Sequence, residues 1–100
     1  MENKIYSDEN LYKITEEHRK TLDIAIRIFK EKNRFYNGEF LKIPIEQNFA
    51  DITRKYNRLN SILNNGGDRS QLNDTLLDLI NYAAMIYIRE NGNVNGISQL

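Results

Sequence analysis

The chain has too few residues of several kinds to build some of the commonest protein sites. It contains no cysteine, which excludes a disulfide framework, a thiolate zinc site and a cysteine nucleophile. Its only histidine, His18, has no second histidine or cysteine to join it as a metal ligand. A Ser–His–Asp arrangement cannot be argued from it either. We therefore interpret His18 as a residue at the edge of a helical core.

A surplus of either charge and long apolar runs are also missing. Fourteen basic residues stand against fourteen acidic ones, so the chain lacks the excess of lysine and arginine on which non-specific nucleic-acid binding depends. The longest apolar run, residues 82–88, is too short to span a bilayer, and the first ten residues contain no apolar signal core. We expect no membrane association and a cytoplasmic location, which is the host cytoplasm if the gene belongs to a phage.

The spacing of the apolar residues is typical of helices. In the first third of the chain they recur every three or four positions and predict a helix over about residues 8–33, with Ser7 as its N-cap. The dipeptide Asn37-Gly38 predicts a turn, and a short extra helical turn is expected near residues 39–43.

A second and a third helix follow Pro44, which suits the first turn of a helix. Six apolar residues of the second helix step by four and three positions and predict its core-facing seam: Ile45, Phe49, Ile52, Tyr56, Leu59 and Leu63. Its end is predicted at residues 64–67, where glycine allows a left-handed cap. The third helix is expected to run to about Glu90, with Ser70 or Asn73 as its N-cap.

These elements predict an all-α fold, because no segment shows the alternation of a strand. We expect a single domain of three main helices over residues 1–90 and a loosely ordered tail over residues 91–100. The third helix is apolar on almost every side, which is typical of a buried helix. In a three-helix protein, a helix can be buried on all sides only if it lies at the centre of the fold or at an interface with another copy. We therefore expect it to be the most buried helix, and the chain to form a homodimer or larger homo-oligomer.

Polar residues nevertheless form a stripe along the third helix and another along the second. Asp74, Asp78 and Asn81 lie four and then three residues apart, which places them on one face. The second helix carries a comparable line beside its apolar seam: Asn48, Asp51, Lys55, Arg58 and Ile62. If the two helices pack antiparallel, Asp51 and Lys55 look toward Asp78 and Asp74.

Two interpretations of these stripes are open. Three converging carboxylates repel one another unless a cation lies between them, and Mg²⁺ accepts such oxygen ligands and binds phosphate in turn. Lys55 and Arg58 would then add phosphate contacts. Alternatively, both stripes face water and the Asp51–Lys55 pair contributes only ~0.3–0.5 kcal/mol. On the first interpretation Asp78→Asn should abolish ligand binding and leave stability unchanged or raised, because one repelling carboxylate is gone.

Three segments carry a resemblance to a known family: KNRFYNGEF at 32–40, FADITRKYNRLNSIL at 49–63 and DTLLDLINYAAM at 74–85. Their order resembles the nucleotide-modification-associated all-α domains of phages and bacteria, which are similar in their motifs to MazG-like NTP pyrophosphohydrolases. The resemblance covers residues 20–88 and implies an oligomeric, nucleotide-handling helical protein. It places Mg²⁺ and nucleotide phosphates at Asp51, Asp74 and Asp78, with Lys55, Arg58, Asn81 and Tyr82 nearby.

The chain also departs from that family's carboxylate pattern. The pyrophosphohydrolases carry E-x-x-E on one helix and E-x-x-D on the next, whereas here Arg54 follows Asp51 at the paired position and the third helix has D-x-x-x-D. We expect a protein that sequesters a nucleotide or slowly hydrolyses it as an Mg²⁺-dependent pyrophosphohydrolase. The alternative is a phage-encoded inhibitor, not an enzyme, that binds a host defence protein such as a CRISPR or other nuclease effector.

Overall fold

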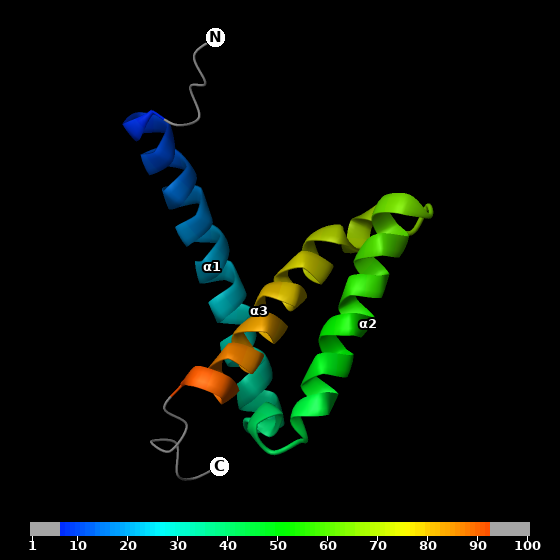
Figure 1. Cartoon of the computed structure of the whole chain (residues 1–100). Coiled ribbons are helices and arrows are strands. Elements are labelled where there is room, and N and C mark those ends of the chain that lie inside the picture. Colours follow the sequence, from blue (N-terminus) through cyan, green and yellow to red (C-terminus); the bar gives the residue numbers. More distant parts are fainter. Residues whose placement is uncertain (1–6, 93–100) are drawn as a thin grey trace.

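A computed structural model describes residues 7–92 and contains three long helices (Figure 1). They are α1 (Asp8–Tyr36), α2 (Ile45–Asn64) and α3 (Leu72–Asn91), with short 3-10 helices η2 (Glu39–Leu41) and η3 (Arg69–Gln71) in the links. The described residues contain no strand, which confirms the all-α prediction. Most of the tail expected over 91–100 lies outside the described residues.

The ends of α1 follow from its flanking residues. The Ser7 side chain accepts a hydrogen bond from the Asn10 backbone N–H at 3.2 Å, so Ser7 is the predicted N-cap. The helix continues three residues past its predicted end. It stops at Asn37 and Gly38, whose φ angles of 55° and 67° place both in the left-handed region that ends helices.

The second link is capped differently from the prediction. Neither Ser70 nor Asn73 caps a helix there. The Asp68 side chain instead accepts a hydrogen bond from the Ser70 backbone N–H at 2.9 Å and begins η3, which leads directly into α3. Gly66, with φ of 76°, supplies the left-handed residue that reverses the chain. As a result α2 and α3 form an antiparallel hairpin, as the sequence predicted (Figure 1).

Helix α3 lies at the centre of the arrangement, because it packs against α2 and also crosses α1 toward its C-terminal end (Figure 1). The Asn81 side chain of α3 donates a hydrogen bond to the Ala25 carbonyl of α1 at 3.0 Å. The Arg89 guanidinium donates to the carbonyls of Phe40 and Ile43, at 3.0 and 2.7 Å. The C-terminal half of α3 therefore fixes both α1 and the link that contains η2.

The inward face of α2 differs in part from the prediction. On α2 the buried residues are Asn48, Lys55 and Ile62, which belong to the polar line. Three residues of the predicted seam remain largely exposed: Phe49 at 47%, Tyr56 at 60% and Leu63 at 49%. The other three, Ile45, Ile52 and Leu59, are half-buried, so the apolar seam of α2 faces inward along one edge only. A long hydrogen bond from Asn48 and the Lys55–Asp78 ion pair hold the polar line inward beside it.

Helix α3 is the least exposed of the three long helices, as predicted. Thr75 and Asn81 are buried and most of its apolar residues are half-buried. Leu76 and Tyr87 are 40% and 67% exposed, so a single chain leaves one side of α3 uncovered. Among the described residues only two apolar side chains, Ala25 and Ile62, are fully buried. Most of the other apolar residues between the helices are half-buried, so the apolar core of a single chain is small and partly open to solvent.

No helix among residues 7–92 is both long and apolar enough to cross a membrane.

Candidate functional site

The polar stripes of α2 and α3 meet at Asp78. One carboxylate oxygen of Asp78 lies 2.8 Å from the ammonium nitrogen of Lys55 on α2, and the other lies 3.1 Å from that of Lys32 on α1. The Lys55 and Asp78 side chains are only 10% and 14% exposed, whereas the Lys32 side chain is 52% exposed. Asp78 therefore joins all three helices through one buried and one accessible ion pair.

These partners determine the protonation of Asp78. Burial works to raise the pKa of Asp78, because a charged carboxylate loses solvation. The hydrogen bonds and positive charges of Lys55 and Lys32 outweigh burial, and they hold the pKa of Asp78 below its ordinary value. Asp78 is thus an anion at neutral pH, and its charge is already balanced.

This arrangement changes the expectation for Asp78→Asn. From the sequence we expected Asp51, Asp74 and Asp78 to repel one another, so that removal of one charge would not destabilise the fold. Instead, the nearest charges to Asp78 are two ammonium groups. Loss of the carboxylate would leave Lys55 buried without a counter-charge, which destabilises a protein.

Other predicted site residues are placed differently. Asp51 faces the same space as Asp78, but its carboxylate is held by Gln47 at 3.3 Å and Arg54 at 3.5 Å, both on its own helix. Asp74 and Arg58 are exposed. The structure therefore brings Lys55, Asp78, Asn81 and Asp51 together and leaves Asp74 and Arg58 at the periphery.

A cavity of about 200 Å³ opens beside Asp78, between the end of α1, the η2 link and the facing sides of α2 and α3. Its charged and amide residues are Lys32, Asn33, Glu39, Asn48, Asp51, Asp78 and Asn81. Its aromatic and aliphatic residues are Tyr36, Phe40, Ile43, Tyr82 and Met85. The cavity thus combines an apolar wall with a charged end, as small-molecule sites commonly do.

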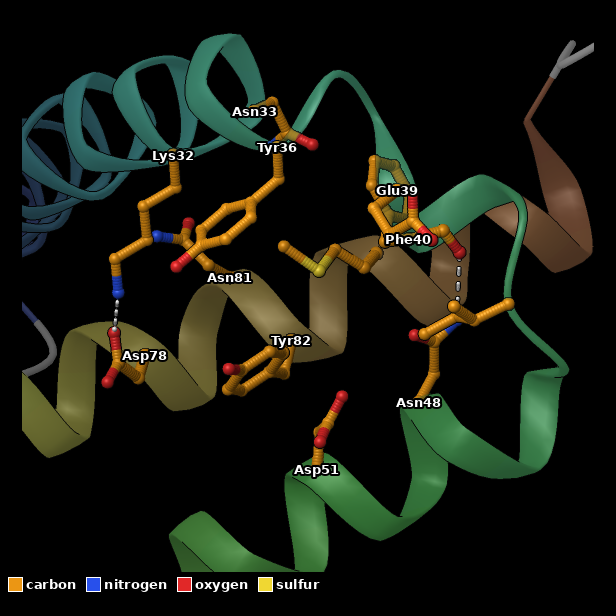
Figure 2. Close-up of a pocket in the computed structure, with 12 residues that line it drawn as sticks. Lys32, Asn33, Tyr36, Glu39, Phe40, Asn48, Asp51, Asp78, Asn81 and Tyr82 are labelled. Carbon is orange, nitrogen blue, oxygen red and sulfur yellow. Dashed lines mark hydrogen bonds and ion pairs between the residues drawn. The ribbon is translucent and has the colours of Figure 1, made fainter. Parts of the chain in front are cut away.

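Figure 2 shows how these side chains converge. The rings of Tyr36, from α1, and Tyr82, from α3, extend into the same space, and Asp51 of α2 points toward Tyr82. The Lys32–Asp78 pair closes one side. On another side the Asn48 amide donates a long hydrogen bond to the Phe40 carbonyl, at 3.4 Å. Each of the three long helices therefore contributes at least one polar side chain.

The residues that α1 and the η2 link contribute to this site were not predicted from the sequence. Lys32 and Tyr36 lie one helical turn apart, so they share a face. Both fall within KNRFYNGEF, the first segment of the family resemblance. Nothing in the spacing of α1 alone indicates that this face meets Asp78, because that contact depends on the angle at which α1 crosses α3.

The predicted metal site at Asp51, Asp74 and Asp78 is not assembled as a cluster. Within the described part of the chain no three His, Cys, Asp or Glu residues are close enough to share a metal ion. Asp78 and Asp51 each have cationic partners instead. Mg²⁺ binding here stays a prediction, and it would require Lys32 or Arg54 to give up its carboxylate.

Comparisons with protein-family models, with curated proteins and with solved structures found no match to this chain.

Proposed function

We propose that the protein binds a nucleotide in the cavity beside Asp78 and acts by holding it rather than by hydrolysing it. The observation that carries this proposal is that two tyrosine rings and a charged lysine–carboxylate end line the same open cavity. A nucleotide has the matching division into a planar base and an anionic phosphate group. The resemblance of the three sequence segments to nucleotide-handling domains supports the same class of ligand.

The aromatic end suits a base. Stacking of a base on an aromatic side chain contributes ~1–3 kcal/mol, and Tyr36 and Tyr82 present rings from two different helices. Asn33 and Asn48 supply amide groups in the same wall, and an amide can both donate to and accept from the polar edge of a base. A tyrosine ring could thus stack on the base while an asparagine from another helix forms hydrogen bonds with its polar edge.

The charged end suits a phosphate. The Lys32 ammonium is the accessible cation of the cavity, and its side chain can turn from Asp78 to a ligand while Lys55 keeps Asp78 paired. Holding rather than hydrolysing is favoured because the two carboxylates of this end, Asp51 and Asp78, already have cationic partners, and the third carboxylate of the cavity, Glu39, belongs to the η2 link rather than to this end. A general base or metal ligand would need at least one of them to be free.

We further propose that the binding unit is a homo-oligomer, because twelve large apolar or aromatic side chains of the described residues are exposed in the single chain. Exposed apolar surface on that scale is uncommon in monomers.

Titration calorimetry with the common ribo- and deoxyribonucleoside mono- and triphosphates, with and without Mg²⁺, tests the proposal. We expect at least one nucleotide to bind without Mg²⁺. Lys32→Gln should weaken its triphosphate binding about tenfold, the effect of one charge-assisted contact worth about 1.4 kcal/mol. Tyr82→Leu should weaken binding of the same nucleotide's mono- and triphosphate forms alike, because the ring contacts the base.

Lys30→Gln is the matched control, because Lys30 is an exposed lysine of α1 that lies outside the cavity. It should leave affinity unchanged. The proposal fails if no nucleotide in the panel binds, or if Lys30→Gln and Lys32→Gln weaken binding equally. Release of pyrophosphate or phosphate during the titration would show hydrolysis and reject the holding role.

A further inference from the structure

The α2–α3 hairpin has an apolar side that nothing in the single chain covers. We call it the outer face and define it by Phe49, Tyr56 and Leu63 of α2 and Leu76 and Tyr87 of α3. Each of these side chains is between 40% and 67% exposed. Because α2 and α3 run antiparallel, Leu63 lies toward the start of α3 and Phe49 toward its other end (Figure 1). The outer face therefore includes residues of both helices along the hairpin.

This face points away from both α1 and the cavity. Asn81 contacts α1 through the Ala25 carbonyl, and at 3.6 residues per turn Leu76 and Tyr87 project from the other side of α3. On α2, Asp51 lines the cavity. Phe49, two residues earlier, points in nearly the opposite direction. The outer face and the candidate site thus occupy opposite sides of the hairpin.

Over residues 75–88 the outer side of α3 carries no charge. This stretch contains a single charged residue, Asp78, and it turns inward to Lys55 and Lys32. Exposed helix faces normally carry charged residues. Helix α1 also exposes apolar side chains, but it intersperses them with three surface ion pairs, one of which joins Lys13 to Glu9. Depletion of charge together with aromatic enrichment is typical of the centre of a protein interface.

We propose that the outer face is a dimer interface, where it packs against the same face of a second copy of this chain. The three aromatic side chains, Phe49, Tyr56 and Tyr87, are exposed by 47%, 60% and 67%. At 150–250 Å² for a fully buried aromatic, they offer roughly 350 Å² per copy. Leu63 and Leu76 add to this, and the half-buried Ile52 and Ile80 lie on the same helices. Together they supply somewhat more than half of the ~800 Å² per partner of a standard interface.

A second copy suits this face better than a lipid surface does. Helices that lie on membranes combine an apolar face with a lysine- and arginine-rich polar face. The polar face of α3 instead carries Asp78 and Asn81, both committed to contacts inside the fold. Pairing two hairpins through this face would enclose four helices around a larger apolar core than one chain has.

Sedimentation equilibrium of the full chain tests this inference and requires no nucleotide. We expect the wild-type mass to be twice 11.8 kDa at micromolar concentration. Tyr87→Glu and Tyr56→Glu should each raise the dissociation constant of the dimer at least 100-fold, because each buries a carboxylate in an apolar contact. Tyr12→Glu is the matched control. Tyr12 lies on α1 and is 68% exposed, almost the same fraction as Tyr87, and its substitution should leave the dimer intact.

A cross-linking experiment keeps the inference testable if the glutamate variants do not fold. The chain has no cysteine, so a cysteine introduced at Ala83, an exposed small residue between Ile80 and Tyr87, is the only one present. A short bis-maleimide should link Ala83→Cys chains into covalent dimers and should not link Tyr12→Cys chains. A monomeric wild type, dissociation by Tyr12→Glu alone, or preferential cross-linking through Tyr12→Cys would overturn the assignment of the outer face.

Discussion

Removal of the Asp78 charge should destabilise the fold by about 2–3 kcal/mol. In Asp78→Asn the Lys55 ammonium, on a side chain only 10% exposed, loses its counter-charge at 2.8 Å. Breaking a buried ion pair by removing one partner costs about 3–5 kcal/mol. The asparagine oxygen can still accept a hydrogen bond from Lys55, which lowers this cost. Loss of the pair with the exposed Lys32 adds only about 0–1 kcal/mol.

The assay is urea unfolding of wild type and variant at one fixed protein concentration, because oligomer stability depends on concentration. A double-mutant cycle identifies the cause. Lys55→Met alone should also destabilise, and Asp78→Asn combined with Lys55→Met should cost less than the sum of the two, by about 1.5 kcal/mol or more. The same cycle between Lys32→Met and Asp78→Asn is the control, and it should give a coupling of about 0.5 kcal/mol or less.

Two results would refute this reasoning. One is an Asp78→Asn variant whose unfolding free energy lies within about 0.5 kcal/mol of wild type, which is the usual range for an exposed substitution. The other is a coupling between Asp78 and Lys55 no larger than that between Asp78 and Lys32. Either would mean that water, rather than Lys55, satisfies the Asp78 carboxylate.

The remaining predictions concern pH, one interhelical hydrogen bond and one turn. Because its folded-state pKa is lowered, Asp78 contributes stability that is present above its unfolded pKa and lost as pH falls through the folded pKa; acid titration below about pH 4 should therefore destabilise wild type more steeply than Asp78→Asn. Asn81→Ala should lower the unfolding free energy by about 0.5–1.5 kcal/mol, because it removes the buried hydrogen bond from Asn81 to the Ala25 carbonyl. Gly67→Ala should cost about 1–3 kcal/mol in thermal or urea unfolding, because its Cβ would lie 3.0 Å from backbone atoms of Ile62. Unchanged stability in either variant would contradict the corresponding contact.

Local features were readable from the sequence because each depends on neighbouring residues. Ser7 caps α1, Asn37-Gly38 ends it, and α2 begins directly after Pro44, all as the residue types predict. The residue that caps the start of α3 could not be predicted from the sequence in the same way. Asp68, Ser70 and Asn73 are all acceptable capping residues, and only the course of the turn after Gly66 decides that Asp68 is used.

The candidate site was readable in part. The spacing of Asp51, Lys55 and Asp78 predicted that the polar stripes of α2 and α3 face each other, and the Lys55–Asp78 contact agrees with this. The contribution of α1 could not be foreseen, because Lys32 reaches Asp78 across 46 residues of sequence. No periodicity along one helix specifies the angle at which it crosses another.

By itself, the sequence determined three helices, their order and most of their ends, since propensity, capping and turn chemistry act within a few residues. Only the tertiary structure decided which side of each helix faces inward. Apolar spacing favours burial of the Phe49–Tyr56 seam, but a lysine and a carboxylate that meet inside the fold satisfy each other. That contact turns the polar line of α2 toward α3. Because the seam lies beside the polar line, turning that line inward leaves Ile45, Ile52 and Leu59 half-buried and brings only the outer edge of the seam, Phe49, Tyr56 and Leu63, to the surface.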